Sequence, residues 1–176
     1  DLTLLSIDGV KEVRLNSLFG AELVAKAAIS IDELLSLATQ NTLEPKPGAP
    51  TEGVPIDFNS AHGTFYWELF FHMVFLIACR LRDEGKYLES QRWFHYIFNP
   101  HIRTPRPGET VPLAQYWQCR VLLEEGLPDF ESKGLVNPDA IAFADRIHYR
   151  KAVFIHYVRC ILAHADSLYR QLTRDS

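Results

Sequence analysis

The apolar positions of the chain form helical stripes separated by segments rich in proline. Between residues 64 and 99, large apolar residues recur three and four positions apart in two runs that only Gly85 separates. A break of one or two residues makes consecutive helices antiparallel neighbours. The pattern therefore predicts a helical hairpin with helices over 64–84 and 86–98, and both helices are rich in Phe and Trp.

A second stripe, near the C-terminal end, repeats every 3.5 residues. Its spacings alternate between four and three, which is typical of a helix that packs lengthwise against a partner helix. The pattern predicts a helix from about Ile147 to Thr173, roughly 40 Å long, and a partner helix beside it. The stripe consists of Phe154, Val158, Ile161, Ala165, Leu168 and Leu172.

Shorter signals organise the remaining segments. Residues 1–15 resemble strands around an Asp8-Gly9 turn, and Asn16 precedes a helical stripe over 17–28. Ser30 and Glu33 form a capping box at the start of a further helix. Four prolines and three glycines between 41 and 63 predict an irregular connection. Pro112 predicts a helix over 113–125, and Asn137-Pro138 predicts a short one ending near Asp145.

Together these elements predict an all-α fold of antiparallel hairpins, with long proline-rich loops and a short extended N-terminal segment. We expect a single helical domain over 1–176. Its parts are N-terminal helices (1–40), a proline-rich connection (41–63), an aromatic hairpin (64–99), a loop and helix (100–136) and C-terminal helices (137–176).

Composition narrows the class of protein. Among 176 residues, 47% are hydrophobic and 23% charged, as in ordinary globular chains, and the net charge of −4 argues against nucleic acid as the main partner. The three cysteines cannot all pair within one chain, and their spacing does not suggest a zinc site, so we expect buried free thiols. Because no Met begins the chain and a helical pattern continues at its end, we expect a piece of a longer polypeptide.

The most apolar run, Leu69–Cys79, raises the question of a membrane span. Glu68 and Arg80 bound it, and only His72 interrupts it. Spanning a bilayer takes about 20 apolar residues. A helix buried on most sides fits this run better, and we expect no direct membrane contact.

Candidate chemistry is sparse. Glu68 and His72 share a helix face and could form an acid–base pair, but a hydrogen-bonded polar pair inside an aromatic helix is the interpretation we favour. His156, Cys160 and His164 form a row along one helix, but the two histidines lie about 12 Å apart along its axis, too far for one ion. We expect no catalytic residue, no metal and no cofactor.

The stretch EGKYLESQRWFHYIFNP is similar to half of a tetratricopeptide repeat. That family repeats every 34 residues, and we find no second copy at this spacing. A protein–protein interaction module that binds a peptide in an aromatic groove is therefore the alternative function.

Three blocks of the chain together resemble the A subunit of the bacterial insecticidal toxin complexes, the Tc toxins. The second block is the most specific, with YWELFFH in one helix and QRWFHYIFNP in the next. Met73-Val74, where members of the family have a proline-containing pair, is a departure that leaves the helical pattern intact. The blocks cover Val13–Pro45, Asp57–Pro100 and Asn137–Asp175.

The resemblance implies a segment of a very large secreted protein that assembles as a bell-shaped homopentamer. In that family a helical shell surrounds a translocation channel, opens on a pH change and is joined to the channel by a linker. Toxin B and C subunits hold the enzyme that is delivered. This segment resembles the shell before the linker, so its partners would be the rest of the A subunit, neighbouring protomers and the B and C subunits.

On this basis, we expect large apolar residues to fill interfaces between stacked helices, with no chemistry of their own. Two histidines, His72 and His95, are possible pH sensors, because imidazole titrates near neutrality. The interface candidates are Trp67, Phe70, Phe71, Trp93, Phe94, Phe98, Phe154, Ile161 and Leu168.

Overall fold

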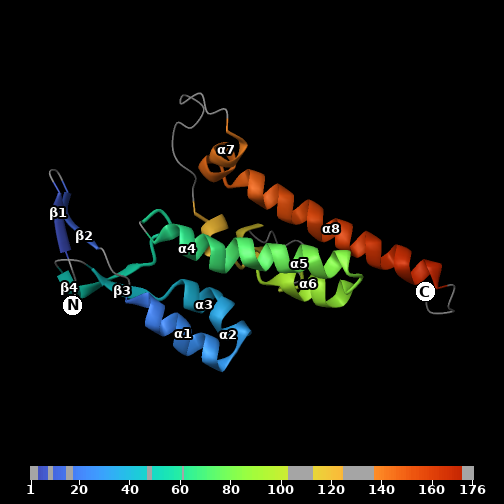
Figure 1. Cartoon of the computed structure of the whole chain (residues 1–176), viewed down its shortest axis with the longest axis horizontal. Helices are drawn as coiled ribbons and strands as arrows, with labels where there is room; N and C mark the ends of the chain where they lie inside the picture. Colours follow the sequence, from blue (N-terminus) through green and yellow to red (C-terminus); the bar gives the residue numbers. More distant parts are fainter. Residues whose placement is uncertain are drawn as a thin grey trace, which may run out of the picture. The chain divides into compact units, whose positions relative to one another are not determined.

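A computed structural model describes most of the chain in two compact units, residues 1–68 and 69–176 (Figure 1), and each unit is described by itself. The single domain expected from sequence stays a prediction, because compactness does not show whether the units fold separately. The described residues are 4–7, 10–14, 18–46, 49–60, 62–102, 113–124 and 137–171.

The first unit begins with the expected extended segment. Strands β1 (Leu4–Ile7) and β2 (Val10–Arg14) pair antiparallel, on either side of the Asp8-Gly9 turn signal. The register shifts between Leu5 and Ile7, which marks an irregularity in the ladder. The strand-like pattern at the start of the chain is therefore confirmed.

Three short helices follow: α1 (Phe19–Ile29), α2 (Ile31–Leu35) and α3 (Leu37–Gln40). The predicted cap at Ser30 is present, because its Oγ accepts a hydrogen bond from the Glu33 backbone N–H at 3.0 Å. Ser36 caps a helix in the same way, because its Oγ accepts a hydrogen bond from the Thr39 backbone N–H. The apolar positions after Ser30 therefore lie on two short helices instead of one. Asn16, the other expected cap, lies outside the described residues.

Our prediction of an irregular connection over 41–63 is wrong for residues 43–46 and 49–55, which form strands. Strands β3 (Leu43–Lys46) and β4 (Ala49–Pro55) form an antiparallel pair in which Pro45 lies opposite Gly53. In a two-stranded sheet both strands are edges, so a proline can turn the side that lacks an N–H away from its partner. The fold is therefore mostly helical but not purely all-α.

Helix α4 (Gly63–Trp67) begins where the chain passes close to its own backbone. A Cβ at Gly63 would lie 2.2 Å from the Phe58 carbonyl oxygen, so only glycine fits there. The core of this unit is aromatic: the Tyr66 ring meets Phe19 and Phe58 edge-on, with centroids 6.0 and 6.2 Å away.

The helix continues through a π turn, Glu68–His72, into α5 (Met73–Asp83), as the 64–84 stripe predicts. The run Gly63–Asp83, with a mean hydropathy of 1.3, is the one helix in the described part of the chain that is long and apolar enough to cross a membrane. This helix is longer than Leu69–Cys79, the run of apolar residues that we judged too short to span a bilayer. A core helix passes the same test, so the absence of membrane contact stays a prediction.

The second unit is built around the predicted hairpin, in which α6 (Tyr87–His95) runs back beside α5 (Figure 1). Gly85 has φ of 78°, a left-handed conformation that suits glycine. The Lys86 N–H donates to the Leu81 carbonyl and the Gly85 N–H to the Arg82 carbonyl, each at 2.9 Å. These two bonds form a Schellman motif, which ends α5 and confirms the hairpin.

The helix predicted over 113–125 is wrong. The segment forms two 3₁₀ turns, η2 (Leu113–Tyr116) and η3 (Arg120–Leu122). Between them Trp117 pairs as an extended bridge with Phe98. Backbone bonds of 2.8 Å run from Asn99 N–H to the Tyr116 carbonyl and from Gln118 N–H to the Ile97 carbonyl. Pairing with the end of α6 therefore overrides the local helical preference.

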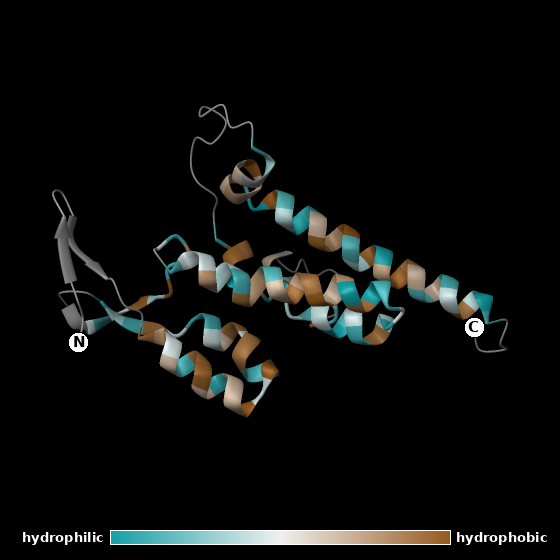
Figure 2. Ribbon diagram, viewed as in Figure 1, coloured by the Kyte–Doolittle hydropathy of each residue, from teal (hydrophilic) through white to brown (hydrophobic). Residues whose placement is uncertain are grey.

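Two helices complete the unit: α7 (Pro138–Ala144) and α8 (Ile147–Arg170), both close to their predicted starts. Helix α8 lies along α6 and contacts α5 (Figure 1). Its ribbon alternates hydrophobic and hydrophilic colours over its whole length (Figure 2), as expected of an amphipathic helix.

Candidate functional site

The contacts between α5, α6 and α8 form an aromatic cluster, here called the ring junction: Phe71, Phe75, Phe94, Phe98 and Tyr157. Centroid distances are 5.9 Å from Phe71 to Phe75 and 6.1 Å from Phe75 to Phe94. Tyr157 of α8 lies 5.9 Å from Phe94 and 5.8 Å from Phe98. Three of these four contacts are edge-to-face, a geometry that contributes about 0.5–1.5 kcal/mol beyond burial of area. The junction therefore joins the π turn and three helices into one packed body.

A buried polar contact lies beside these rings. The Ser90 hydroxyl of α6 donates to the Ala78 carbonyl of α5 at 2.7 Å, and the Cys160 thiol of α8 donates to Ser90 Oγ at 3.3 Å. Burial raises the pKa of the Cys160 thiol, which keeps it in the donating form. Ser90 therefore hydrogen-bonds to both of its neighbouring helices.

Sequence reasoning missed Ser90. The signal was a small polar residue inside the apolar stripe of the second hairpin helix, between Tyr87 and Phe94. Such a residue marks close helix approach, because a larger side chain would hold the backbones apart.

The three cysteines are free thiols, as expected. Cys119 is fully buried and its thiol donates to the Phe70 carbonyl at 3.4 Å, within the π turn. Burial raises the pKa of Cys119 to about 12, so the thiol stays protonated at neutral pH. Cys79 is half-buried, and desolvation raises its pKa as well.

The row of His156, Cys160 and His164 faces the hairpin. His156 Nδ1 lies 2.9 Å from Arg82 Nη1 and 3.4 Å from Cys79 Sγ. Arg82 has no acceptor, so Nδ1 accepts its hydrogen bond in the neutral tautomer. Burial, followed by the charge of Arg82, lowers the pKa of His156. Across the described residues there is no group of three or more His, Cys, Asp or Glu that could hold a metal.

The two candidate pH sensors occupy different places. His95 lies between α6 and α8, with Nε2 3.2 Å from Tyr157 Oη and its ring 5.6 Å from that of His101. Burial lowers the pKa of His95, and the nearby His101 lowers it further. His72 ends the π turn, where its ring meets those of Phe71 and Tyr149 at 5.0 and 6.2 Å.

The interface candidates fall into three groups. Trp67 of the first unit and Phe70, Phe71 and Phe94 of the second are buried. Trp93 and Phe98 are half-buried. Phe154, Ile161 and Leu168 are exposed, and the α8 residues buried in the unit are instead Val153, Tyr157 and Cys160. The roles of all nine stay predictions.

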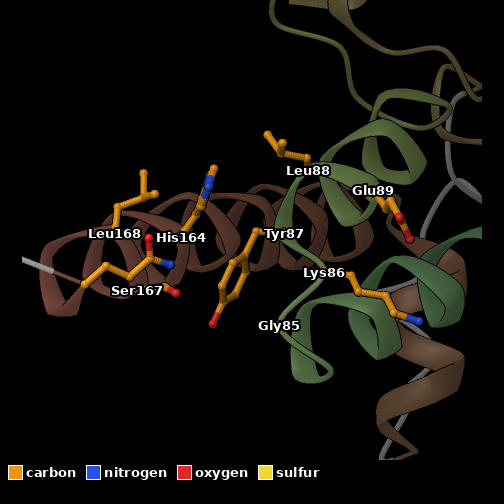
Figure 3. A pocket seen from close by; sticks show the side chains of 9 residues that line it. Gly85, Lys86, Tyr87, Leu88, Glu89, His164, Ser167 and Leu168 are labelled. Carbon is orange, nitrogen blue, oxygen red and sulfur yellow. The ribbon is translucent and has the colours of Figure 1, made fainter. Parts of the chain in front are cut away.

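A shallow depression of about 300 Å³ lies where the start of α6 meets the last turns of α8 (Figure 3). The Tyr87 ring stacks on His164 there, with centroids 5.4 Å apart and planes at 24°. Lys86, Glu89 and Ser167 also line the depression, which therefore has mixed polarity.

Aromatic rings, hydroxyls, thiols and backbone carbonyls make the contacts between these helices, so the described site is one of helix packing. No family model matches the chain. It is 39% identical over 162 residues to toxin subunit YenA2 of Yersinia entomophaga, covering 92% of this chain and 12% of YenA2.

Two solved structures have similar folds. The Yersinia pseudotuberculosis TcaA-TcaB structure matches with a TM-score of 0.73 and 29% identity, over 96% of this chain and 9% of that one. Morganella morganii TcdA4 matches with a TM-score of 0.78 and 20% identity, over 98% of this chain and 12% of that one, a likeness of fold alone. The chain is therefore related to the A-type components of the insecticidal Tc toxins, as its three sequence blocks indicate.

Proposed function

We propose that the chain is a structural segment of the helical shell of a secreted Tc toxin A subunit and has no catalysis of its own. Its place is before the linker that leads to the translocation channel. It packs against the rest of the A subunit and against neighbouring protomers of a homopentamer, in a complex that also contains B and C subunits. It makes no direct membrane contact.

The observation that carries this proposal is the ring junction in a relative of Tc toxin subunits. Fully burying one Phe side chain stabilises a fold by about 1.5–3 kcal/mol, and Phe70 and Phe94 are both fully buried. Close-packed interiors transmit strain instead of absorbing it, which suits the wall of a container. Two of the three thiols, those of Cys160 and Cys119, are hydrogen-bond donors to Ser90 and to the Phe70 carbonyl, which is a packing role.

Three variants of the complete A subunit that carries this segment test the proposal. Phe94→Ala should reduce the yield of assembled particles, measured by size-exclusion chromatography and electron microscopy. Leu88→Ala, on the same helix but 64% exposed, is the matched control and should assemble normally. Glu68→Gln should assemble and deliver a reporter enzyme normally. A Glu68→Gln particle that assembles fully but delivers nothing would favour chemistry over structure.

A pH-sensing role remains part of the proposal for His95, because it lies between two packed helices. Protonated His95 would face the neighbouring His101, and its Nε2 could only donate in the contact with Tyr157 Oη. His72 has two aromatic neighbours, Phe71 and Tyr149, so its replacement changes ring contacts instead. Replacing each with Gln separately should shift the acid midpoint of shell opening, and an unchanged midpoint removes that residue from the proposal.

A further inference from the structure

Helix α8 carries an exposed apolar surface beside the face that packs on the hairpin, here called the outer ridge. One row of it has large apolar residues at seven-residue intervals, each at least 36% exposed: Ile147, Phe154, Ile161 and Leu168. A parallel row repeats at the same interval: Ile155, Leu162 and Tyr169. Of these residues Phe154 touches another ring, that of Phe98 at 5.8 Å, and is still 52% exposed.

The seven-residue interval fixes the direction of a covering element. Residues seven apart drift by only about 20° around a straight helix, so each row stays on one line over three heptads. A steeply crossing helix touches one or two turns and would leave most of the ridge exposed. A helix running lengthwise beside α8, over roughly 33 Å, covers both rows.

The ridge is a second packing face, because α8 already uses another one. Val153, Tyr157 and Cys160, which face the hairpin, are buried in the unit. The two faces are made by different residues of one helix, so a helix on the ridge would add a further layer beside the hairpin.

Charges beside the ridge indicate the chemistry of that helix. Lys151 and Arg159 are exposed beside the two rows, with Asp166 as the one exposed carboxylate on α8, and Arg170 is exposed farther around the helix. A second copy of α8 would bring the same surplus of positive charge to the contact, which is unfavourable. A helix whose apolar stripe is flanked by Asp or Glu is complementary.

The relatives indicate where such a helix comes from. The matched segment is 12% of YenA2, so most of that polypeptide lies outside it. We propose that the outer ridge of α8 is the docking surface for an acidic amphipathic helix supplied by the part of the A-type polypeptide outside residues 1–176. This inference rests on the proposed function, because it needs that longer polypeptide.

Photo-cross-linking in the complete A-type polypeptide tests it. A benzophenone amino acid at Ile161 or Leu162 should cross-link to one helical segment outside 1–176 that contains Asp or Glu, identified by mass spectrometry. The same probe at Arg170, on the polar side of α8, should yield much less product. Arg159→Glu should reduce the cross-link from Ile161, whereas Asp166→Arg should not, and circular dichroism checks that both variants fold.

Three results would overturn the inference: cross-links to α8 of another copy, cross-links only within 1–176, or equal yields at Ile161 and Arg170. The proposed function fails by a different result. If removing 1–176 leaves assembly and delivery unchanged, the segment is not structural, whatever the ridge contacts. If assembly requires the segment but Ile161 gives no cross-link, the inference about the ridge is wrong and the proposed function stands.

Discussion

The two long faces of α8 are covered very differently. The face toward the hairpin carries Val153, Tyr157 and Cys160, all buried, and it makes hydrogen bonds as well as ring contacts. The outer ridge carries larger aliphatic residues, yet Ile161 is 41% exposed and Leu162 58%. The hairpin therefore covers the side of α8 that makes ring contacts and hydrogen bonds, although the outer ridge carries more large aliphatic residues. Four changes test this difference between the two sides.

The largest effect on stability is expected from Phe94→Ala on α6, where the ring packs against Tyr157 on the covered side of α8. Removing a fully buried ring at the centre of the ring junction should cost about 3–5 kcal/mol of unfolding free energy, including the cavity left behind. Urea unfolding of the 176-residue chain, followed by circular dichroism, measures it. Leu88→Ala on the same helix should stay within about 0.5 kcal/mol. Equal losses for the two variants would contradict the described packing.

Ser90→Ala should have an intermediate effect of about 1 kcal/mol, because it removes hydrogen bonds in a buried place. The same unfolding assay applies. Ser167→Ala on α8, at the rim of the shallow depression, is the matched control and should change little. A Ser90→Ala chain as stable as the original would show that the hydroxyl does not hold the three helices together.

The pH dependence of stability should be smaller again and has a definite sign. The pKa values of His95 and His156 lie below the ordinary 6.5 in the folded chain, so the unfolded chain binds protons first as pH falls. The unfolding free energy should therefore decrease from about pH 7 downward, until the folded pKa values are passed. His95→Gln should flatten that slope, measured by melting temperature against pH. An unchanged slope would mean that His95 does not contribute.

The smallest effect is expected on the outer ridge. Leu162→Gln in the 176-residue chain should change the unfolding free energy by no more than about 0.5 kcal/mol, because the side chain is already exposed. Val153→Ala, on the covered side, should cost several times more, since it removes buried methyl groups. A large loss for Leu162→Gln would show that the ridge is covered within this chain.

The parts of the fold that could be predicted are those in which local chemistry and tertiary packing agree. The hairpin is such a case, because the stripes before and after Gly85 have helical period and glycine adopts the left-handed conformation of the stop. The cap at Ser30 is another, because capping depends on residues three apart in sequence.

The parts of the fold that were predicted wrongly depend on contacts with residues distant in sequence. The 113–125 segment has helical chemistry, but its backbone pairs with Ile97 and Asn99. The β3–β4 hairpin contains prolines that argue against a strand everywhere except at an edge. The α8 stripe was recognised correctly as apolar, yet periodicity cannot tell which of two faces the chain itself covers. The π turn carried no pattern that local rules detect, and the only signal at Ser90 was a small polar residue inside an apolar stripe.

The two buried thiols of the second unit, Cys119 and Cys160, can be used to measure local opening of the fold. Cys119 lies against the Phe70 carbonyl of the π turn, and Cys160 lies against Ser90 between α6 and α8. A thiol reagent reaches either one only when that neighbourhood opens, so each labelling rate measures one local opening equilibrium. Comparing the two rates would reveal whether the π turn and the three-helix contact loosen together or in sequence.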